Sequence, residues 1–279
     1  MQHNRIGVFD SGLGGLTVFQ ALQQTLPHES ILYFGDTARL PYGSRSKAEI
    51  LQFVREILTW MTAENTKMVI MACNTSSALA LEEVQSEFPM PILGIILPGA
   101  QAAVHRGQRV GVIATSATVA SLAYPHAIHE ADPTAQVWQM DCPDFVPLIE
   151  SDRIHDPYTQ QVAQNYLAPL LAQNIDTLIY GCTHYPHLAP VLRRILPPTV
   201  RCINPATFVA QAAARELHLM GLHNTQPLAV DHRFGVSGDP ATFAHLAQKW
   251  LNQPLNVEKV HLPTVQSESA SVQPVDSSG

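Results

Sequence analysis

Short apolar runs rich in β-branched residues alternate along the chain with longer stretches in which apolar residues recur every three or four positions. The short runs have the length of strands, whereas the longer stretches, such as 47–64, have the period of amphipathic helices. This alternation is typical of an α/β protein whose sheets are mainly parallel. Strands are expected at 6–9, 30–34, 68–72, 92–96, 110–114, 135–140, 177–180 and 200–203.

The middle of the chain reads as a second domain inserted into the first. A chain of 279 residues is long enough for two small domains. Leu97-Pro98-Gly99 follows one expected strand, and Asn204-Pro205 follows a much later one, so both segments are candidate crossings. We therefore expect a first α/β domain at 1–97 and 208–262 and a second at 98–207.

Composition excludes several classes of protein. Apolar residues make up 46% of the chain and charged residues only 14%, so the chain as a whole is not disordered, although the serine-rich end at 263–279 is expected to be. The net charge of −7, with no basic run, argues against nucleic acid as a partner. No apolar run is long enough to cross a membrane, and the first residues do not resemble a signal peptide, so we expect a cytoplasmic protein.

Two of the four cysteines follow expected strands and precede helix starts. The segments Cys73-Asn74-Thr75 and Cys182-Thr183-His184 form a weak internal repeat, which suggests two similar doubly wound halves facing one another. The carboxyl ends of parallel strands are where open α/β sheets bind ligands, and helix amides there favour a thiolate or a bound carboxylate. Cys142 and Cys202 lack such a turn and read as core residues, and all four are expected to be reduced thiols.

A glycine-rich turn follows the first expected strand. The dinucleotide-binding fingerprint fails there, because Thr17 stands where a third Gly or Ala is needed. We expect the turn to approach a small anion such as a carboxylate, and Asp10, at the tip of the strand, to pair with an amine or to hold a catalytic group. Asp36 ends the next strand in the same way, but this signal is weak alone.

Other polar groups gather near the second cysteine. His184 is a candidate acid–base partner of Cys182, since imidazole titrates near neutral pH. The nearby histidines do not have the four-ligand spacing of a structural zinc site, so no metal is expected. Glu150 ends an apolar run, where most glutamates lie on the surface.

Taken together, these motifs resemble the cofactor-independent glutamate racemases, within the wider aspartate/glutamate racemase group. Six motifs keep the family order, and they cover about 6–251. The chain departs from the family pattern at Leu97, Ala114, His187 and Asn204, none of which adjoins a cysteine. The matching motifs are Phe9-Asp10-Ser11-Gly12-Leu13-Gly14-Gly15, Gly35-Asp36-Thr37, Pro41-Tyr42-Gly43, Ala72-Cys73-Asn74-Thr75, Val146-Pro147-Leu148-Ile149-Glu150 and Gly181-Cys182-Thr183-His184-Tyr185-Pro186.

The resemblance implies two similar domains with an active site in the cleft between them. It implies that Cys73 takes the α-proton from D-glutamate while Cys182 protonates the opposite face, and the reverse for L-glutamate, with Asp10, His184, Glu150 and Asp36 assisting. It also implies no cofactor, a homodimer, and D-glutamate supply for peptidoglycan synthesis. The implied substrate contacts are Asp10, Ser11, Tyr42, Gly43, Asn74, Thr75, Thr183 and His184.

Three alternatives stay open at this point. A cysteine hydrolase or amidotransferase-like enzyme would use Cys182 as nucleophile and His184 as base, and would leave Cys73 unused. A non-catalytic module of the same fold would bind an amino acid without exchanging its α-proton. An aspartate or hydantoin racemase with the same cysteine pair is the closest alternative, because the length of the substrate pocket does not follow from the sequence.

Overall fold

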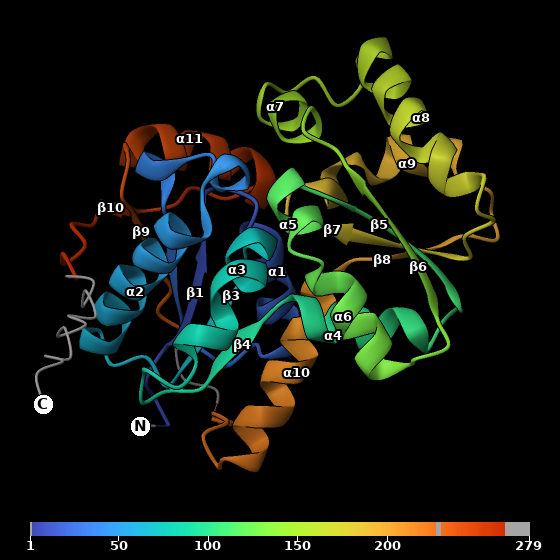
Figure 1. Cartoon of the computed structure of the whole chain (residues 1–279). Coiled ribbons are helices and arrows are strands. Elements are labelled where there is room, and N and C mark those ends of the chain that lie inside the picture. The colour runs from blue at the N-terminus through green and yellow to red at the C-terminus, as the bar shows by residue number, and fades with distance from the viewer. Residues whose placement is uncertain (1, 227–229, 266–279) are drawn as a thin grey trace, which may run out of the picture.

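Two parallel β-sheets, each flanked by helices, form the two halves of the molecule (Figure 1). The computed structural model describes residues 2–226 and 230–265. The first sheet has the strand order β10-β9-β2-β1-β3-β4, and every adjacent pair in it is parallel. Its strands are β1 (Ile6–Asp10), β2 (Ile31–Gly35), β3 (Met68–Met71), β4 (Ile92–Gly94), β9 (Arg233–Val236) and β10 (Val257–Lys259).

The second sheet repeats the central part of the first. Its order is β6-β5-β7-β8, again all parallel, which matches β2-β1-β3-β4 strand for strand. Strands β3 and β7 therefore occupy equivalent places, as the weak internal repeat around the two cysteines predicts. The strands are β5 (Arg109–Ala114), β6 (Gln136–Asp141), β7 (Thr177–Gly181) and β8 (Arg201–Ile203).

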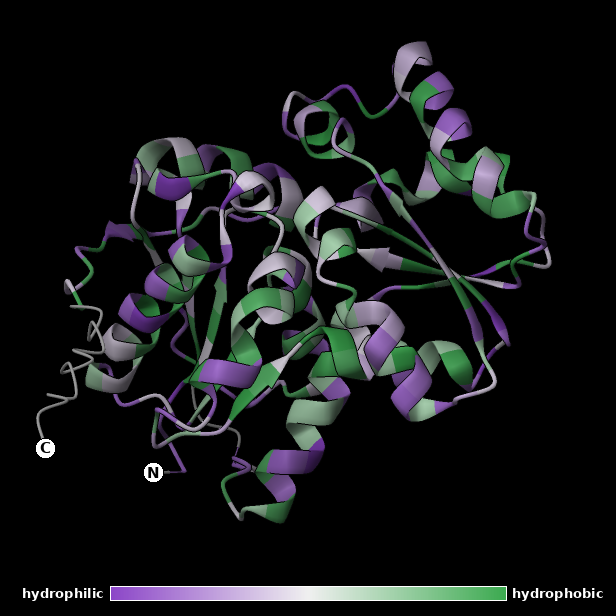
Figure 2. Ribbon diagram, in the orientation of Figure 1, coloured by the Kyte–Doolittle hydropathy of each residue, from purple (hydrophilic) through white to green (hydrophobic). Residues whose placement is uncertain are grey.

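Helices cover both faces of each sheet, with apolar sides turned inward (Figure 2). Helix α2 shows how the sequence sets this: Ser46 and Glu49 form a capping box at its start, and Ile50, Val54 and Ile57 on one side are buried. The helices are α1 (Leu16–Thr25), α2 (Lys47–Ala63), α3 (Asn74–Val84), α4 (Ile96–Val104), α5 (Ser116–Ala120), α6 (Ala123–Ala131), α7 (Phe145–Glu150), α8 (Pro157–Leu171), α9 (Ala189–Ile195), α10 (Pro205–Leu219) and α11 (Pro240–Leu251), with short 3₁₀ turns η1 (Thr37–Arg39), η2 (Tyr42–Ser44) and η3 (Tyr185–Leu188).

The chain passes between the halves through α4 and α10, which pack against each other (Figure 1). One apolar core cluster extends from β1 and β3 across these two helices to β5 and β7. The two halves are therefore joined by a continuous core at this end of the molecule.

Several sequence-based expectations need correction. The strand expected at 92–96 ends at Gly94, and Leu97-Pro98-Gly99 lies inside α4 rather than in a connecting segment. The apolar run continues from a buried strand into a buried helix, and periodicity does not separate the two. Both expected domain boundaries, after 97 and after 207, thus fall within helices, and the division itself stays a prediction.

Two strands were not expected from the sequence. β9 and β10 are short and carry the charged residues Arg233, Glu258 and Lys259, so neither has the apolar pattern of a buried strand. They extend the first sheet beyond β2. Of the expected disordered end at 263–279, residues 266–279 lie outside the described residues.

Candidate functional site

The two cysteines lie at equivalent positions just after β3 and β7. Cys73 is the N-cap residue of α3, and Cys182 lies between β7 and η3. Their side chains are only 6% and 7% exposed. Each thiol is thus nearly buried at the carboxyl edge of its sheet, where ligands bind in folds of this class.

On the second half, Cys182 belongs to a row of three polar side chains. His184 Nδ1 lies 3.7 Å from Cys182 Sγ, and His184 Nε2 lies 3.1 Å from Glu150 Oε1 at the end of α7. Burial lowers the pKa of His184, but its hydrogen bonds to Cys182 and Glu150, together with the negative charges of Cys182 and Asp10, outweigh burial and raise that pKa to about 10. His184 is therefore a cation at neutral pH, placed to stabilise negative charge on the Cys182 sulfur.

On the first half, Cys73 has the opposite surroundings. Burial, and then the negative charges of Asp10 and Cys182, raise its pKa to about 12, against a smaller opposing effect of hydrogen bonding at Ser76. The thiol is therefore protonated at neutral pH.

Asp10 links the two halves. Its Oδ2 accepts a 3.0 Å hydrogen bond from the Gly12 amide, and the Thr183 hydroxyl donates to its Oδ1 over 3.3 Å. Complete burial raises the pKa of Asp10, and the His184 charge and these hydrogen bonds oppose that rise. A carboxyl group from β1 therefore reaches the segment that carries Cys182.

Residues from the second half also reach the Cys73 side. Tyr124 donates a 2.7 Å hydrogen bond to Asn74 Oδ1, and the Thr75 hydroxyl lies 3.0 Å from that of Thr115 and 3.3 Å from that of Thr118. Within the described part of the chain, the buried Asn74 Nδ2 has no hydrogen-bond acceptor. The site thus holds a spare amide donor next to Cys73.

Three of these partners escaped the sequence analysis. Thr115, Thr118 and Tyr124 lie on or beside α5 and α6, far along the chain from either cysteine motif. Hydroxyl residues near a strand end are common, and only the packing of one half on the other brings these to Asn74 and Thr75.

Asp36 is buried among hydrogen-bond partners, and its assisting role stays a prediction. Its Oδ2 accepts hydrogen bonds from Tyr42 and from Arg39 Nε, the latter at 2.6 Å, and its Oδ1 accepts one from Ser237 at 2.7 Å. These bonds fix the buried Tyr42, whose pKa burial and the Asp36 charge raise well above its usual value. Asp36 thus holds Tyr42 in place.

Two other expected contact residues lie in loops around the site. Ser11 is buried in the turn after β1. A Cβ atom on Gly43 would lie 3.2 Å from Thr115 Cβ, so the η2 turn passes close to the second half there.

The glycine-rich turn after β1 packs against the Cys182 segment. A Cβ atom on Gly14 would lie 2.2 Å from Thr183 Oγ1 and 2.5 Å from His184 Nδ1, and one on Gly15 would lie 2.5 Å from Asp10 Cβ. Only glycine fits at such distances. These glycines therefore let the two halves meet at the site.

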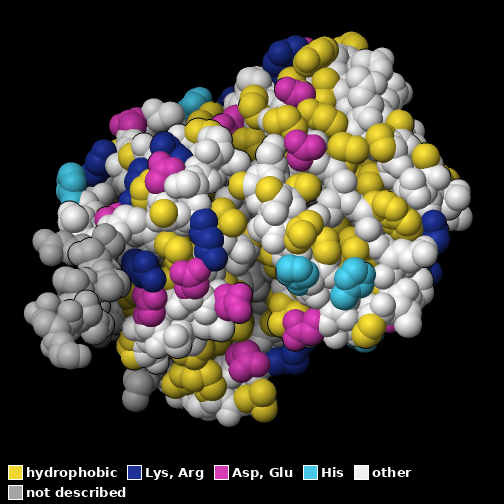
Figure 3. Space-filling model, viewed as in Figure 1, with side chains coloured by type: hydrophobic (Ala, Val, Ile, Leu, Met, Phe, Trp, Pro, Cys, Tyr) yellow, Lys and Arg dark blue, Asp and Glu magenta, His cyan; other side chains and the backbone are white. Residues whose placement is uncertain are grey.

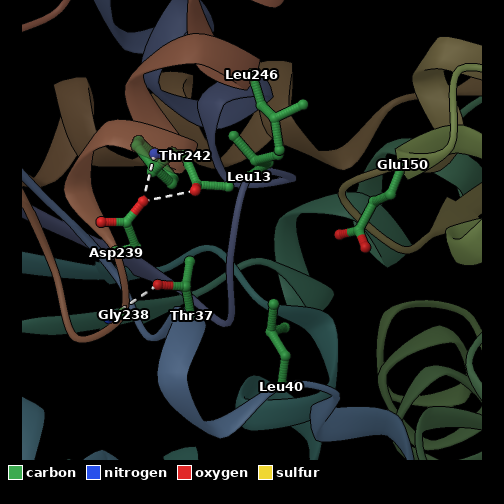
Figure 4. Close-up of a pocket in the computed structure, with 9 residues that line it drawn as sticks. Leu13, Thr37, Leu40, Glu150, Gly238, Asp239, Thr242 and Leu246 are labelled. Atoms are coloured by element: carbon green, nitrogen blue, oxygen red, sulfur yellow. Dashed lines mark hydrogen bonds between the residues drawn. The ribbon is translucent and has the colours of Figure 1, made fainter.

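A cavity of about 250 Å³ opens beside this cluster. Figure 4 shows Glu150 facing it from one side, while Leu13, Thr37 and Leu40 and the start of α11 border the other. Glu150 also contacts His184, whereas neither Cys73 nor Cys182 is among the residues that line the cavity. The remaining lining residues are Gly238, Asp239, Thr242, Phe243 and Leu246.

Charged side chains and histidines are spread over the face of the molecule that Figure 3 shows. Acidic and basic side chains are interspersed on the first half, and histidines lie on both halves. In residues 2–226 and 230–265, no three His, Cys, Asp or Glu side chains cluster closely enough to hold a metal ion. None of the described helices has the length and apolar character needed to cross a lipid bilayer.

Comparisons with known proteins agree with the fold and the motifs. The family model described as Asp/Glu/Hydantoin racemase matches residues 6–213. The glutamate racemase of Rippkaea orientalis is 65% identical over 264 residues, which cover 94% of this chain and 93% of that protein.

Solved structures extend this likeness to three dimensions. A glutamate racemase isoform from Bacillus anthracis has a TM-score of 0.91 at 37% identity, covering 95% of this chain and all of that one. The glutamate racemase of Francisella tularensis, solved in complex with D-glutamate, has a TM-score of 0.87 at 35% identity, covering 94% and 98%. The chain therefore belongs to the Asp/Glu/hydantoin racemase family, as an amino-acid racemase of its glutamate racemase group.

Proposed function

We propose that this racemase interconverts L- and D-glutamate by moving protons between the substrate α-carbon and the thiols of Cys73 and Cys182, without a cofactor. The observation that carries the proposal is the placement of these two thiols after the equivalent strands β3 and β7. Inverting a stereocentre by proton transfer needs a base on one face and an acid on the other. Two opposed groups of the same chemistry meet that need in both directions.

The charged groups around Cys73 differ from those around Cys182, and this difference assigns the two cysteines their roles. The His184 cation lies beside Cys182, whereas burial and Asp10 keep Cys73 protonated. We assign the acid toward L-glutamate to Cys73 and the base to Cys182. The α-C–H bond breaks as an S–H bond forms at Cys182, and the Cys73 proton is transferred to the other face of the carbanion. No electrons are gained or lost.

Substrate binding would use donors for two carboxylates and an acceptor for the ammonium group. The Nδ2 group of Asn74, which has no acceptor among the described residues, and the hydroxyl groups of Ser11 and Thr75 are suitable donors. The Thr183 hydroxyl would first have to release Asp10. Asp10 supplies a carboxyl group at the same place. The relative from Francisella tularensis, which binds D-glutamate in its solved structure, supports glutamate as the substrate.

The biological setting is part of the proposal. D-Glutamate formed by this reaction would supply peptidoglycan synthesis, in the cytoplasm. A homodimer is also expected from the family resemblance.

Exchange of the α-proton tests the proposal directly. The purified chain is incubated with L-glutamate in D₂O without pyridoxal phosphate, while NMR follows loss of the α-proton signal and circular dichroism follows loss of optical activity. We expect both. Cys73→Ser and Cys182→Ser should each abolish racemisation, whereas Cys202→Ser, which alters a half-buried thiol on β8, should not.

Other outcomes would favour the alternatives. Full turnover by Cys73→Ser would contradict two-base transfer and favour a hydrolase using Cys182. Glutamate binding without α-proton exchange would favour a binding module. Faster α-proton exchange with aspartate than with glutamate would identify aspartate as the substrate.

A further inference from the structure

Trp250, near the end of α11, lies where the two halves meet beside Cys182. It packs against the core cluster that includes β1 and also against the cluster beneath β7, and among the described residues no other partly buried apolar side chain packs against both. Its carbonyl oxygen accepts a 3.3 Å hydrogen bond from Gln20 on α1. The backbone of Trp250 is therefore anchored to the first half, while its side chain packs against both clusters.

On the second half, the indole contacts two histidines of one turn. The His184 ring meets it edge to face, with 5.8 Å between centroids and an interplanar angle of 86°. The His187 ring lies against it at 3.9 Å and 40°. Trp250 and His187 thus form an aromatic pair next to the imidazole that contacts Cys182.

His187 differs from His184 in charge. Burial, and then the charge of His184, lower the pKa of His187 to about 4, so it is neutral at neutral pH. Its buried Nε2 has no hydrogen-bond partner in the described part of the chain. His187 therefore serves as an aromatic packing group and leaves proton transfer to its neighbour.

Building on the proposed two-cysteine reaction, we infer that Trp250 is a positioning residue for His184. Packing from α11 and His187 holds the imidazole plane so that Nδ1 faces Cys182 while Nε2 faces Glu150. The titratable groups that act on His184 are Cys182 and His187 on its own segment, Glu150 from α7 and Asp10 from β1. Trp250 adds no charge and fixes only the orientation of the ring.

Substitution at Trp250 should separate positioning from folding. We expect Trp250→Leu to lower kcat with L-glutamate by about tenfold or more while KM changes little, because a misplaced acid–base group slows the chemical step. Trp250→Phe should recover much of the loss. Leu251→Ala, at the next position and packed against the first cluster only, is the matched control and should lower stability but not kcat.

A fluorescence titration gives a second readout that stability does not affect. In a Trp60→Phe/Trp138→Phe variant, Trp250 is the remaining indole, and a nearby imidazolium quenches indole emission. Emission should rise as His184 loses its proton near pH 10, together with the loss of kcat/KM, and His184→Gln should remove this transition.

Two results would overturn the inference: unchanged kcat in a folded Trp250→Leu variant, or a fluorescence transition that persists in His184→Gln. Failure of the proposed reaction would look different. A chain that does not racemise glutamate but keeps the His184-dependent transition would contradict the two-cysteine mechanism while preserving the contact between Trp250 and His184.

Discussion

The two thiols of the site have contrasting surroundings, although the strands that carry them are equivalent. Cys73 is buried beside the carboxyl group of Asp10, whereas Cys182 lies beside an imidazolium. This asymmetry arises from single residues around each sulfur, and in the proposed two-cysteine reaction it would give the two directions different starting states. We therefore expect the rates with L- and D-glutamate to respond differently to pH.

Glu150 should set the alkaline limit of activity through His184. The pKa of His184 is raised above its ordinary value, so its protonated form stabilises the native state fully below about pH 6.5 and this contribution is lost as pH rises through about 10. Glu150→Gln removes a charged hydrogen-bond partner and lowers that pKa. The alkaline limb of the kcat/KM profile should move down by about one pH unit.

The measurement is a profile of kcat/KM from about pH 7 to about pH 10.5, taken in both directions. Glu130→Gln, which alters an exposed glutamate on α6, is the control and should leave the profile unchanged. An unchanged or upward-shifted limb in Glu150→Gln would show that the carboxylate does not act on His184.

The sequence identifies most residues of the candidate site, but it does not identify the side chains that surround them. Motif positions point to the cysteines, Asp10 and His184, and the structure brings Cys182, His184 and Glu150 together, with Asp10 bonded to the neighbouring Thr183. Trp250 escapes such analysis, because an aromatic residue at helical spacing looks like any core residue. Its role depends on a contact between segments that are far apart in the sequence.

At the scale of elements, the site is built where strands end and the next segment turns. The eight strands expected from apolar runs are present, with small differences at their ends, because buried parallel strands leave a clear signal. β9 and β10 leave none, since three or four residues with charged side chains do not differ from a loop in periodicity. The pairing of β9 with β2, and of β10 with β9, is a tertiary effect.

The turn between β1 and α1 should not tolerate a side chain at Gly14. Gly14→Ala places a methyl group within 2.2 Å of Thr183 Oγ1, so the Cys182 segment has to move. We expect a loss of about 1–3 kcal/mol in the free energy of unfolding and a kcat at least about tenfold lower.

Gly12→Ala in the same turn is the matched control. Its nearest new contact is 3.4 Å, to a Leu40 side-chain atom, and the amide that donates to Asp10 is retained. Urea unfolding and steady-state kinetics on both variants test this prediction. Equal effects of the two substitutions would contradict it.

At the scale of the whole molecule, a buried ion pair holds the returning chain against the first sheet. Lys67 Nζ lies 2.6 Å from Glu29 Oε2, and both side chains are almost fully buried. Lys67 also donates to the carbonyl oxygens of Gln2 and Leu222, while the Asn224 amide donates to Glu29. The segment after α10 is therefore fastened beneath β2 and β3.

Breaking this pair should destabilise the protein strongly. Lys67→Met leaves the Glu29 carboxylate buried without its cation, and we expect the free energy of unfolding to fall by about 3–5 kcal/mol. The double variant Lys67→Met/Glu29→Leu should lose less. Lys47→Met, which removes an exposed pair with Glu83, should hardly change the urea midpoint. A midpoint for Lys67→Met equal to that of Lys47→Met would refute the prediction.

The parallel pairing of β2 with β9 also bears on how the protein is made. Leu32 pairs with Arg233. One edge of β2 therefore stays unpaired during synthesis until β9 has been translated, which happens only after the whole second sheet. An open strand edge invites pairing with other chains, and a long wait extends that risk. Helix α11, with Trp250, emerges later still. A nascent chain thus carries both cysteines once residue 182 has been added, and it acquires a complete site only near the end of translation.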